Sequence, residues 1–226
     1  KSFHEIWKLL VLERFLVRLG KSTYSSKLIF KGGLLLSYYL EIKRETIDVD
    51  LLARKIDVEK ENMTHIITDI CNVAVDDGFL LSFESIQGLD HKHMSYPGFR
   101  VKISTCFGNM KDRFQLDIGV GDAVEPVTID WPLFEHKNLP LFADELSLMV
   151  YPVEAIFSEK LETVIARGGL NSRMKDFHDL YLLCKSNQIM DLKTLIKNIN
   201  ETFKNRGTDF ILPIQFNDKE ITNLNS

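Results

Sequence analysis

The chain has 226 residues, 45% hydrophobic and 27% charged, with a formal net charge of −4, which fits a globular protein with a sizeable core and argues against a generally basic nucleic-acid-binding coat. Residues 1–19 carry charges throughout, and no apolar run approaches the ~20 residues of a membrane span, so we expect neither a signal peptide nor a membrane partner. Three widely spaced cysteines stand among apolar residues and predict buried, reduced thiols in a cytoplasmic protein: Cys71, Cys106 and Cys184.

The first predicted element is a helix over residues 3–19. Ser2 and Glu5 form a capping-box pattern, apolar residues recur at helical spacing, and Gly20 is expected to end the helix. The charge balance of residues 1–44 is +6, whereas that of the remaining chain is −10. This basic region could guide a polyanion toward an acidic site, or it could form solvated helix faces.

A glycine pair stands between a short link and a second helix. Residues 27–30 read as the link, and Gly32-Gly33 opens a helix that runs to about residue 41. A strand is expected over residues 46–53, because apolar and polar side chains alternate there.

Acidic side chains mark the polar faces of two predicted strands. Asp48 and Asp50 alternate with apolar residues in the strand that follows the glycine helix. Asp117 lies in the second arm of a hairpin, on the face opposite to its apolar residues. If the two strands are neighbours, three carboxylates converge and repel one another unless a cation is bound between them. The elements expected in this middle region are a helix over 60–76, a strand over 79–86, and hairpin arms over 99–107 and 113–120.

From about residue 145 the pattern turns helical. Helices are expected from Pro152 to Arg167, from a cap at Ser172 to Lys185, and over 191–204. We therefore predict an α+β fold, a mixed sheet flanked by helices with a helical C-terminal part. The predicted domains are 1–143, an αβ core, and 144–226, a helical domain.

The glycines and the acids fit phosphate chemistry. Mg²⁺ prefers hard oxygen ligands, and two such ions can clamp the attacking and leaving oxygens of a displacement at phosphorus. Gly32 and Gly33 lack Cβ atoms, so a phosphate can approach the backbone at the N-terminus of the following helix. Each feature alone is weak evidence, because most glycine pairs are turns and short acidic motifs recur by chance.

Four blocks in this order resemble the AbiEii-type nucleotidyltransferases, toxins of bacterial toxin–antitoxin and abortive-infection systems. The blocks are FKGGLLL…RETIDVDLL, FQLDIGVGD, FSEKLETVIAR and RMKDFHDLYLL, and they span roughly residues 28 to 185. The resemblance implies a polymerase-β-like nucleotidyltransferase fold. It also implies Mg²⁺-dependent transfer of a nucleotide from an NTP to an acceptor, which for some members is the 3′ end of tRNA.

The resemblance assigns roles in the αβ part. Asp48 and Asp50 match the metal pair, and Asp117 matches the third carboxylate, which binds metal and can draw the proton from the attacking hydroxyl. Gly32 and Gly33 match the first motif, although leucine follows where a hydroxyl residue is frequent. Thr46 occupies the place of a serine near the metal acids and is assigned to nucleotide binding.

The helical part carries a further set of candidate residues. Lys160 lies on the apolar stripe of its helix, where it could pair with an anion or extend its ammonium to water. The resemblance favours the first reading, in which Lys160 neutralises triphosphate charge and Asp176 orients it by a hydrogen bond. Arg167 could contact phosphate or could cap its helix. Asp179 is interpreted as structural.

The sequence therefore predicts a nucleotidyltransferase that uses two Mg²⁺ ions and an NTP. The expected acceptor is RNA, in particular a tRNA end, the expected effect is growth arrest or phage defence, and an antitoxin is the expected partner. Two alternatives stay open at this point. A related enzyme could modify a protein or a small molecule such as an aminoglycoside, and a degenerate copy could bind RNA or a partner without turnover.

Overall fold

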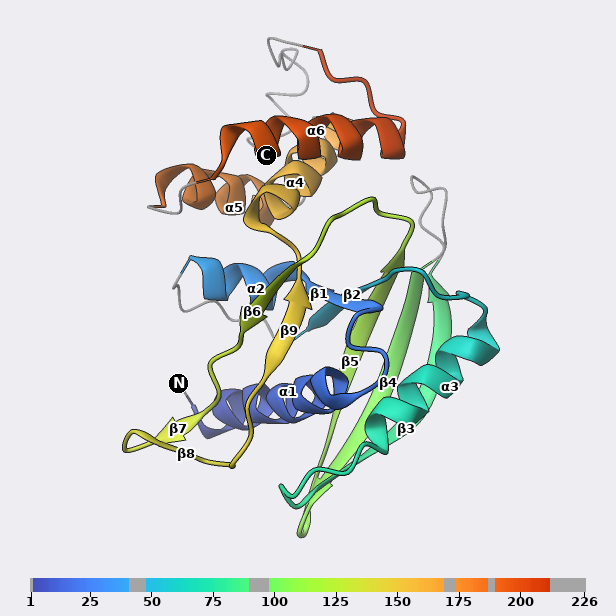
Figure 1. Ribbon diagram of the computed structural model, residues 1–226, viewed down its shortest axis with the longest axis vertical. Coiled ribbons are helices and arrows are strands. Elements are labelled where there is room, and N and C mark those ends of the chain that lie inside the picture. Colours follow the sequence, from blue (N-terminus) through green and yellow to red (C-terminus); the bar gives the residue numbers. More distant parts are fainter. Residues whose placement is uncertain (1, 41–47, 90–97, 169–173, 187–189, 212–226) are drawn as a thin grey trace. The chain divides into compact units, whose positions relative to one another are not determined.

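A computed structural model describes residues 2–40, 48–89, 98–168, 174–186 and 190–211 (Figure 1). The chain divides into two compact units. The segments of the first unit are 1–35, 43–121 and 126–151, and those of the second are 36–42, 122–125 and 152–226. The predicted domains have other bounds, 1–143 and 144–226, and they stay a prediction.

The first unit is built on a mixed seven-stranded sheet of order β3-β4-β5-β2-β1-β9-β6. β2 pairs with β5 and β1 with β9 in parallel, whereas the other neighbours are antiparallel. The strands are β1 Leu28–Lys31, β2 Val49–Ala53, β3 Phe79–Leu89, β4 Gly98–Phe107, β5 Met110–Val120, β6 Val127–Asp130 and β9 Ser147–Val150. A separate small hairpin consists of β7 Glu135–His136 and β8 Leu139–Pro140.

Two helices cover one face of this sheet. α1 Phe3–Lys21 and α3 Lys60–Cys71 contact each other, and α3 packs on β3 (Figure 1). The ring of Phe15 in α1 meets that of Phe114 in β5 with centroids 5.7 Å apart. The alternating apolar residues of β4 and β5 are buried on this side, so the opposite side of these strands carries their polar residues.

The capping box of α1 is confirmed. Glu5 N–H donates to Ser2 Oγ at 3.3 Å, and Ser2 N–H donates to the Glu5 carboxylate at 2.6 Å. The prediction that Gly20 ends the helix was wrong, because α1 continues to Lys21. Gly20 serves packing instead: a Cβ there would lie 2.8 Å from Leu146 Cδ1.

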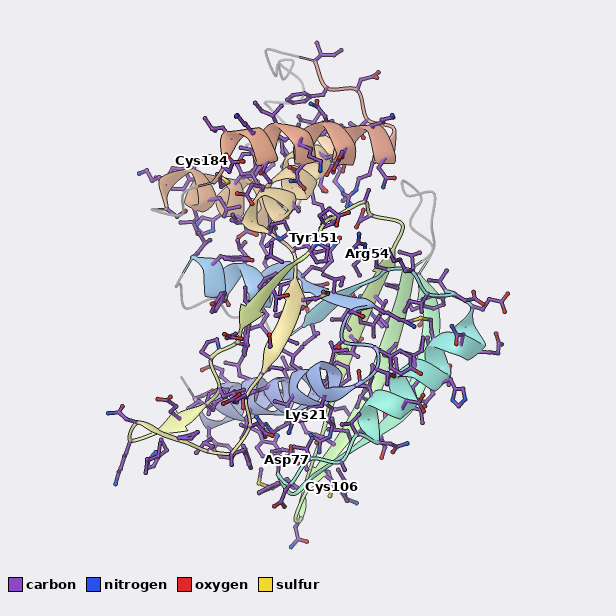
Figure 2. The ribbon with its side chains drawn as sticks, in the orientation of Figure 1. Lys21, Arg54, Asp77, Cys106, Tyr151 and Cys184 are labelled. Atoms are coloured by element: carbon purple, nitrogen blue, oxygen red, sulfur yellow. The ribbon has the colours of Figure 1, made fainter. Side chains whose placement is uncertain are left out.

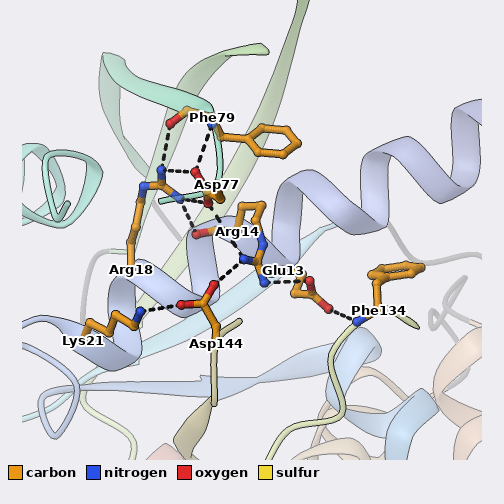
Figure 3. A network of polar contacts seen from close by, with 8 residues as sticks. All are labelled: Glu13, Arg14, Arg18, Lys21, Asp77, Phe79, Phe134 and Asp144. Carbon is orange, nitrogen blue, oxygen red and sulfur yellow. Dashed lines mark hydrogen bonds and ion pairs between the residues drawn. The ribbon is translucent and has the colours of Figure 1, made fainter. Parts of the chain in front are cut away.

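Basic side chains of α1 enter a buried ion-pair network, shown in Figure 3. Arg18 donates to both oxygens of Asp77 at 2.7 and 2.9 Å, and Arg14 donates to Asp144 at 2.7 Å. Lys21 also pairs with Asp144. Glu13 accepts from Arg14, and burial raises the pKa of its carboxyl above the usual range. Arg14 and Arg18 are buried and anchor α1, so these two bases are neither solvated nor available to a polyanion, whereas Lys21 is exposed.

Several segments of the first unit differ from the sequence-based expectation. The helix expected over 60–76 ends at Cys71, and two further segments form strands. Residues 28–30, which belong to the predicted link 27–30, form three of the four residues of β1, and residues 147–150, predicted as the start of a helical region, form β9. Both strands are four-residue runs too short for a periodicity to develop. β1 lies between β2 and β9 in the sheet, and this tertiary position makes it a strand.

The second unit is helical, as predicted. α4 Val153–Arg167 packs against α5 Met174–Lys185 and α6 Leu192–Arg206. α2 Gly32–Tyr39 begins in the first unit, and its residues from Leu36 onward belong to the second. The predicted cap at Ser172 lies outside the described residues. The whole is the predicted α+β architecture, a mixed sheet flanked by helices with a helical C-terminal part. Among the described residues, no helix is both long and apolar enough to cross a membrane.

The cysteines only partly follow the expectation of burial. Cys71 is buried, but Cys106 is partly exposed and Cys184 is exposed. Figure 2 shows Cys106 at the end of the sheet where Asp77 also lies, far from Tyr151 at the other end. All three are free thiols, in agreement with the prediction that they form no disulfide framework.

Candidate active site

Asp50 and Asp117 lie side by side on neighbouring strands. β2 and β5 run parallel, and the two residues are direct register partners. Adjacent strands are about 4.8 Å apart, and register partners project their side chains to the same face. The condition for the acids to converge, that the two strands are neighbours, is therefore met, and the acids share one side of the sheet.

Asp48 joins this pair from just outside the strand. It precedes Val49, the first residue of β2, and it is exposed. Burial raises the pKa of Asp50 above its usual range. Lys31 opposes this rise, while the charges of Asp117 and Asp48 add to it. The carboxylates are thus close enough for each charge to affect the next.

A cation stands at each end of the acid pair. Lys31 in β1 is the register partner of Asp50, and Arg100 in β4 is the register partner of Asp117. The four residues form one row across β1, β2, β5 and β4, with the two acids between the two bases. The positive charge on each side of the acid pair offsets the repulsion between the two adjacent carboxylates.

Arg100 holds Asp117 in a bidentate ion pair. Its Nε donates to Oδ1 at 2.8 Å and its Nη2 to Oδ2 at 2.7 Å, and this hydrogen bonding with Asp117 raises the pKa of the guanidinium. Sequence reasoning missed Arg100. The feature of the sequence that could have identified Arg100 is the tight turn at Gly108-Asn109, because this turn sets the register of the hairpin. The glycine of this turn has a φ of +57°. Counting back from that turn along both arms pairs residue 100 with residue 117.

Lys31 is held in place by an aromatic residue. Its Nζ lies 3.1 Å from the hydroxyl oxygen of Tyr151 and 4.4 Å from the centroid of the Tyr151 ring. Tyr151 is fully buried and directly follows β9, and its N–H donates to the carbonyl of Phe30. The parallel pairing of β1 with β9 thus fixes Lys31 beside Asp50.

The glycine pair contacts the acids directly. Gly32 has a φ of +82°, and a Cβ there would lie 1.9 Å from Asp50 Oδ2. The backbone N–H of Gly33 donates to the Asp50 carboxylate, which favours its charged form. The first turn of α2 therefore offers an anion position that the Asp50 carboxylate fills in this structure.

The donor set suits a hard divalent cation, although its oxygens are not gathered around one point. Asp48, Asp50 and Asp117 offer only carboxylate oxygens, as Mg²⁺ prefers. Within the part of the chain that the structure describes, no three His, Cys, Asp or Glu side chains converge as a metal site. The carboxylates do not converge because Arg100 binds both oxygens of Asp117 and because the Asp50 carboxylate lies against Gly32. Binding of a metal would require these side chains to turn.

The second unit brings Lys160, Asp176 and Asp179 together in one cluster. Lys160 Nζ lies 2.9 Å from Asp176 Oδ1 and 2.7 Å from Asp179 Oδ2, and both acids are buried. The predicted hydrogen bond between Lys160 and Asp176 is present. Asp179, interpreted as structural, lies just as close to the ammonium. Arg167 is the exposed last residue of α4, and Thr46 lies outside the described residues.

The chain is similar to known proteins in fold and in family. The crystal structure of JHP933 from Helicobacter pylori has a TM-score of 0.53 and 14% identity, and the match covers 99% of this chain and 88% of that one, a likeness of fold alone. No curated protein matches the sequence. The family model "Nucleotidyl transferase AbiEii toxin, Type IV TA system" matches residues 14–225, nearly the whole chain. The chain therefore belongs to the AbiEii family of nucleotidyl transferase toxins of type IV toxin–antitoxin systems.

Proposed function

We propose that this nucleotidyl transferase toxin moves a nucleotide from an NTP to the 3′ hydroxyl of an RNA, with a tRNA as the acceptor. The observation that carries the proposal is the register pairing of Asp50 with Asp117 next to Gly32. It brings carboxylates that are distant in sequence to one side of the sheet, beside a helix N-terminus suited to phosphate. Growth arrest, with a role in phage defence, is the proposed effect in the cytoplasm.

The acids would hold the metal and manage the proton. Asp48, Asp50 and Asp117 are the proposed ligands of two Mg²⁺ ions, which when bound would stabilise charge on the attacking and leaving oxygens. Asp117, once released by Arg100, can accept the proton of the attacking hydroxyl. The N–H groups at the start of α2 are the proposed donors to the triphosphate, a contact that needs no side-chain hydroxyl after the glycines.

The remaining candidate residues stay predictions. Lys160 and Arg167 are proposed to neutralise triphosphate charge, with Asp176 orienting Lys160, and Thr46 is proposed to contact the nucleotide. A cognate antitoxin is the proposed partner, because the matching family model describes a toxin of a toxin–antitoxin system.

A label-transfer assay tests the proposal. The full chain is incubated with Mg²⁺, each labelled NTP in turn, and total RNA, beside the variants Asp48→Ala and Lys160→Ala. We expect label on small RNA with wild type and none with Asp48→Ala. Asp130→Ala is the matched control, because Asp130 is an exposed strand acid in β6 of the same sheet and should not affect transfer.

Each contrary outcome identifies a different error. Label on a protein or a small molecule would move the acceptor to that class and refute the RNA. Equal transfer by wild type and Asp48→Ala would refute the carboxylate site. No pyrophosphate release with any NTP and acceptor would indicate a binding module without turnover.

A further inference from the structure

The three-stranded part of the sheet has an open face. One side of β3, β4 and β5 is buried under helices, while the residues that alternate with the buried ones reach solvent. The open side chains form four rows in register, and the first row contains Asp117. The rows are Gln87–Arg100–Asp117, Ser85–Lys102–Gln115, Ser82–Ser104–Arg113 and Leu80–Cys106–Lys111.

Positive charge collects on this face although the chain as a whole is acidic. Its bases are Arg100, Lys102, Lys111 and Arg113, and its acids are Asp117 and Glu84. Asp117 is paired with Arg100, and Glu84 is paired with Arg113 at 2.7 Å. Among the residues that the structure describes, neither Lys102 nor Lys111 forms an ion pair. Both ammonium groups are therefore available to an outside anion.

The lysines lie on a line that leads away from the acid pair. Successive rows are about 6.7 Å apart, because a strand rises about 3.35 Å per residue. Lys102 is in the row next to Asp117, and Lys111 is in the last row, about 20 Å from Asp117 by the same rise. Serine and glutamine side chains lie between them and can bond to phosphate or sugar oxygens. A chain of phosphates that ends at Asp117 would meet both lysines.

We propose that the open face of β3, β4 and β5 binds the acceptor as a single-stranded RNA. Its 3′ end lies at Asp117, and its backbone follows β4 and β5 past Lys102 toward Lys111. The inference rests on the proposed function and adds the surface that holds the acceptor. Within the described chain, no aromatic side chain belongs to the four rows, so bases have no stacking platform there. Binding is therefore driven by the backbone, tolerant of sequence and sensitive to salt.

Fluorescence anisotropy with a labelled single-stranded RNA of about 16 nucleotides tests the surface. The full chain is titrated without NTP at salt concentrations from about 50 to about 200 mM. For wild type we expect log K to fall linearly with log salt. In the double variant Lys102→Gln/Lys111→Gln the slope should shrink by about 1.4, because each lost phosphate contact removes about 0.7 on a single strand.

A matched double variant controls for net charge. Lys60→Gln/Lys137→Gln removes two charges from the start of α3 and from the β7–β8 turn, away from the open face, and should keep the wild-type slope. All four lysines are exposed, so thermal unfolding should be unchanged in both variants. Equal slopes in all three proteins, or equal losses in both variants, would overturn the proposal and leave a face that is merely solvated.

Crosslinking gives the direction of the strand. A thiouridine next to the RNA 3′ end should crosslink near Arg100 and Asp117, and one placed several nucleotides upstream should crosslink nearer to Lys111. The reverse order, or crosslinks outside β3–β5, would overturn the proposal while transfer to RNA by wild type still supported the proposed function. Label transfer to a protein instead of RNA would overturn both.

Discussion

Gly32 leaves no room for a β-carbon beside Asp50. A Cβ at this position would lie 1.9 Å from Oδ2 and 2.5 Å from Cγ of the carboxylate, and the φ of +82° is one that residues with side chains rarely adopt. Glycine is thus required twice over, once for the turn that starts α2 and once for the approach of the acid. The backbone of this turn and the Asp50 carboxylate form a single unit, so a change in one displaces the other.

Gly32→Ala should therefore disable the site and weaken the fold. We expect a loss of about 1–3 kcal/mol in the free energy of unfolding, the range for strained backbone, and a loss of nucleotide transfer because Asp50 is displaced. Urea unfolding and the label-transfer assay measure the two effects. Gly88→Ala is the matched control, since Gly88 has nothing within 4 Å of its Cβ position and should tolerate the change. Equal stability of the two variants would contradict the inferred clash.

Arg100→Gln should tighten divalent-metal binding. Both oxygens of Asp117 are engaged by Arg100 in this structure, so a metal that uses Asp117 must first displace the guanidinium. An ion pair as exposed as this one contributes up to about 1 kcal/mol, and its removal should improve Mg²⁺ or Mn²⁺ affinity by up to about fivefold. Isothermal titration without nucleotide measures this directly.

The control for Arg100→Gln is Lys102→Gln. It removes the same charge from the same face of β4, one row away from Asp117. Its metal affinity should change much less, because it does not occupy a ligand oxygen. If both variants bind metal alike, general charge rather than competition for Asp117 sets the affinity.

The helices and the acid pair could be predicted from the sequence because their signals are local. The capping box of Ser2 and Glu5, and the alternation around Asp50 and Asp117, each fall within a few residues. The sequence alone could not predict that the two acid strands are neighbours. No local rule pairs β2 with β5, whose register partners are more than sixty residues apart in the chain. The family resemblance suggested that pairing, and the register confirms it.

The features that could not be predicted from the sequence depend on tertiary contacts. Four-residue strands such as β1 and β9 are strands only because neighbours lie on both sides. Arg100 reads as an ordinary polar residue of a solvated strand face until the hairpin register places it opposite Asp117. The excess of basic residues in 1–44 is evident from the sequence, but their ion-pair partners are not. Arg14 pairs with Asp144 and Arg18 with Asp77, and both acids are distant in the chain.

Lys160→Met should destabilise the second unit. Asp176 and Asp179 have side chains only 6% and 2% exposed, so removing the ammonium breaks an ion pair with each of two buried carboxylates. We expect a loss of about 3 kcal/mol or more in unfolding free energy, in the range for a broken buried ion pair. Lys197→Met is the matched control, since its pair with Glu201 is exposed and is worth no more than about 0.5 kcal/mol. A similar small loss in both would show that solvent screens the Lys160 cluster.

Asp144→Asn should make stability less dependent on acid pH. Burial acts to raise the pKa of Asp144, but hydrogen bonds from Lys21 and Arg14 outweigh it, and the pKa is lowered from 3.8. A carboxyl whose folded pKa is depressed contributes stability that is present above its unfolded pKa and is lost as the pH falls through the folded pKa. At pH 7 the variant should be less stable by about 3 kcal/mol, because the buried Arg14 loses a charged partner.

The difference between wild type and Asp144→Asn should shrink as the pH falls from about 5 through 3.8 toward the depressed folded pKa, below which the wild-type carboxyl is protonated in both states. Urea unfolding at several pH values measures it. Asp57→Asn is the control, because Asp57 lies near the start of α3, outside the network of Figure 3, and should give a difference that is small at every pH. A gap for Asp144→Asn that stays constant down to pH 3 would show that its effect comes from packing, because an ionic contribution must titrate.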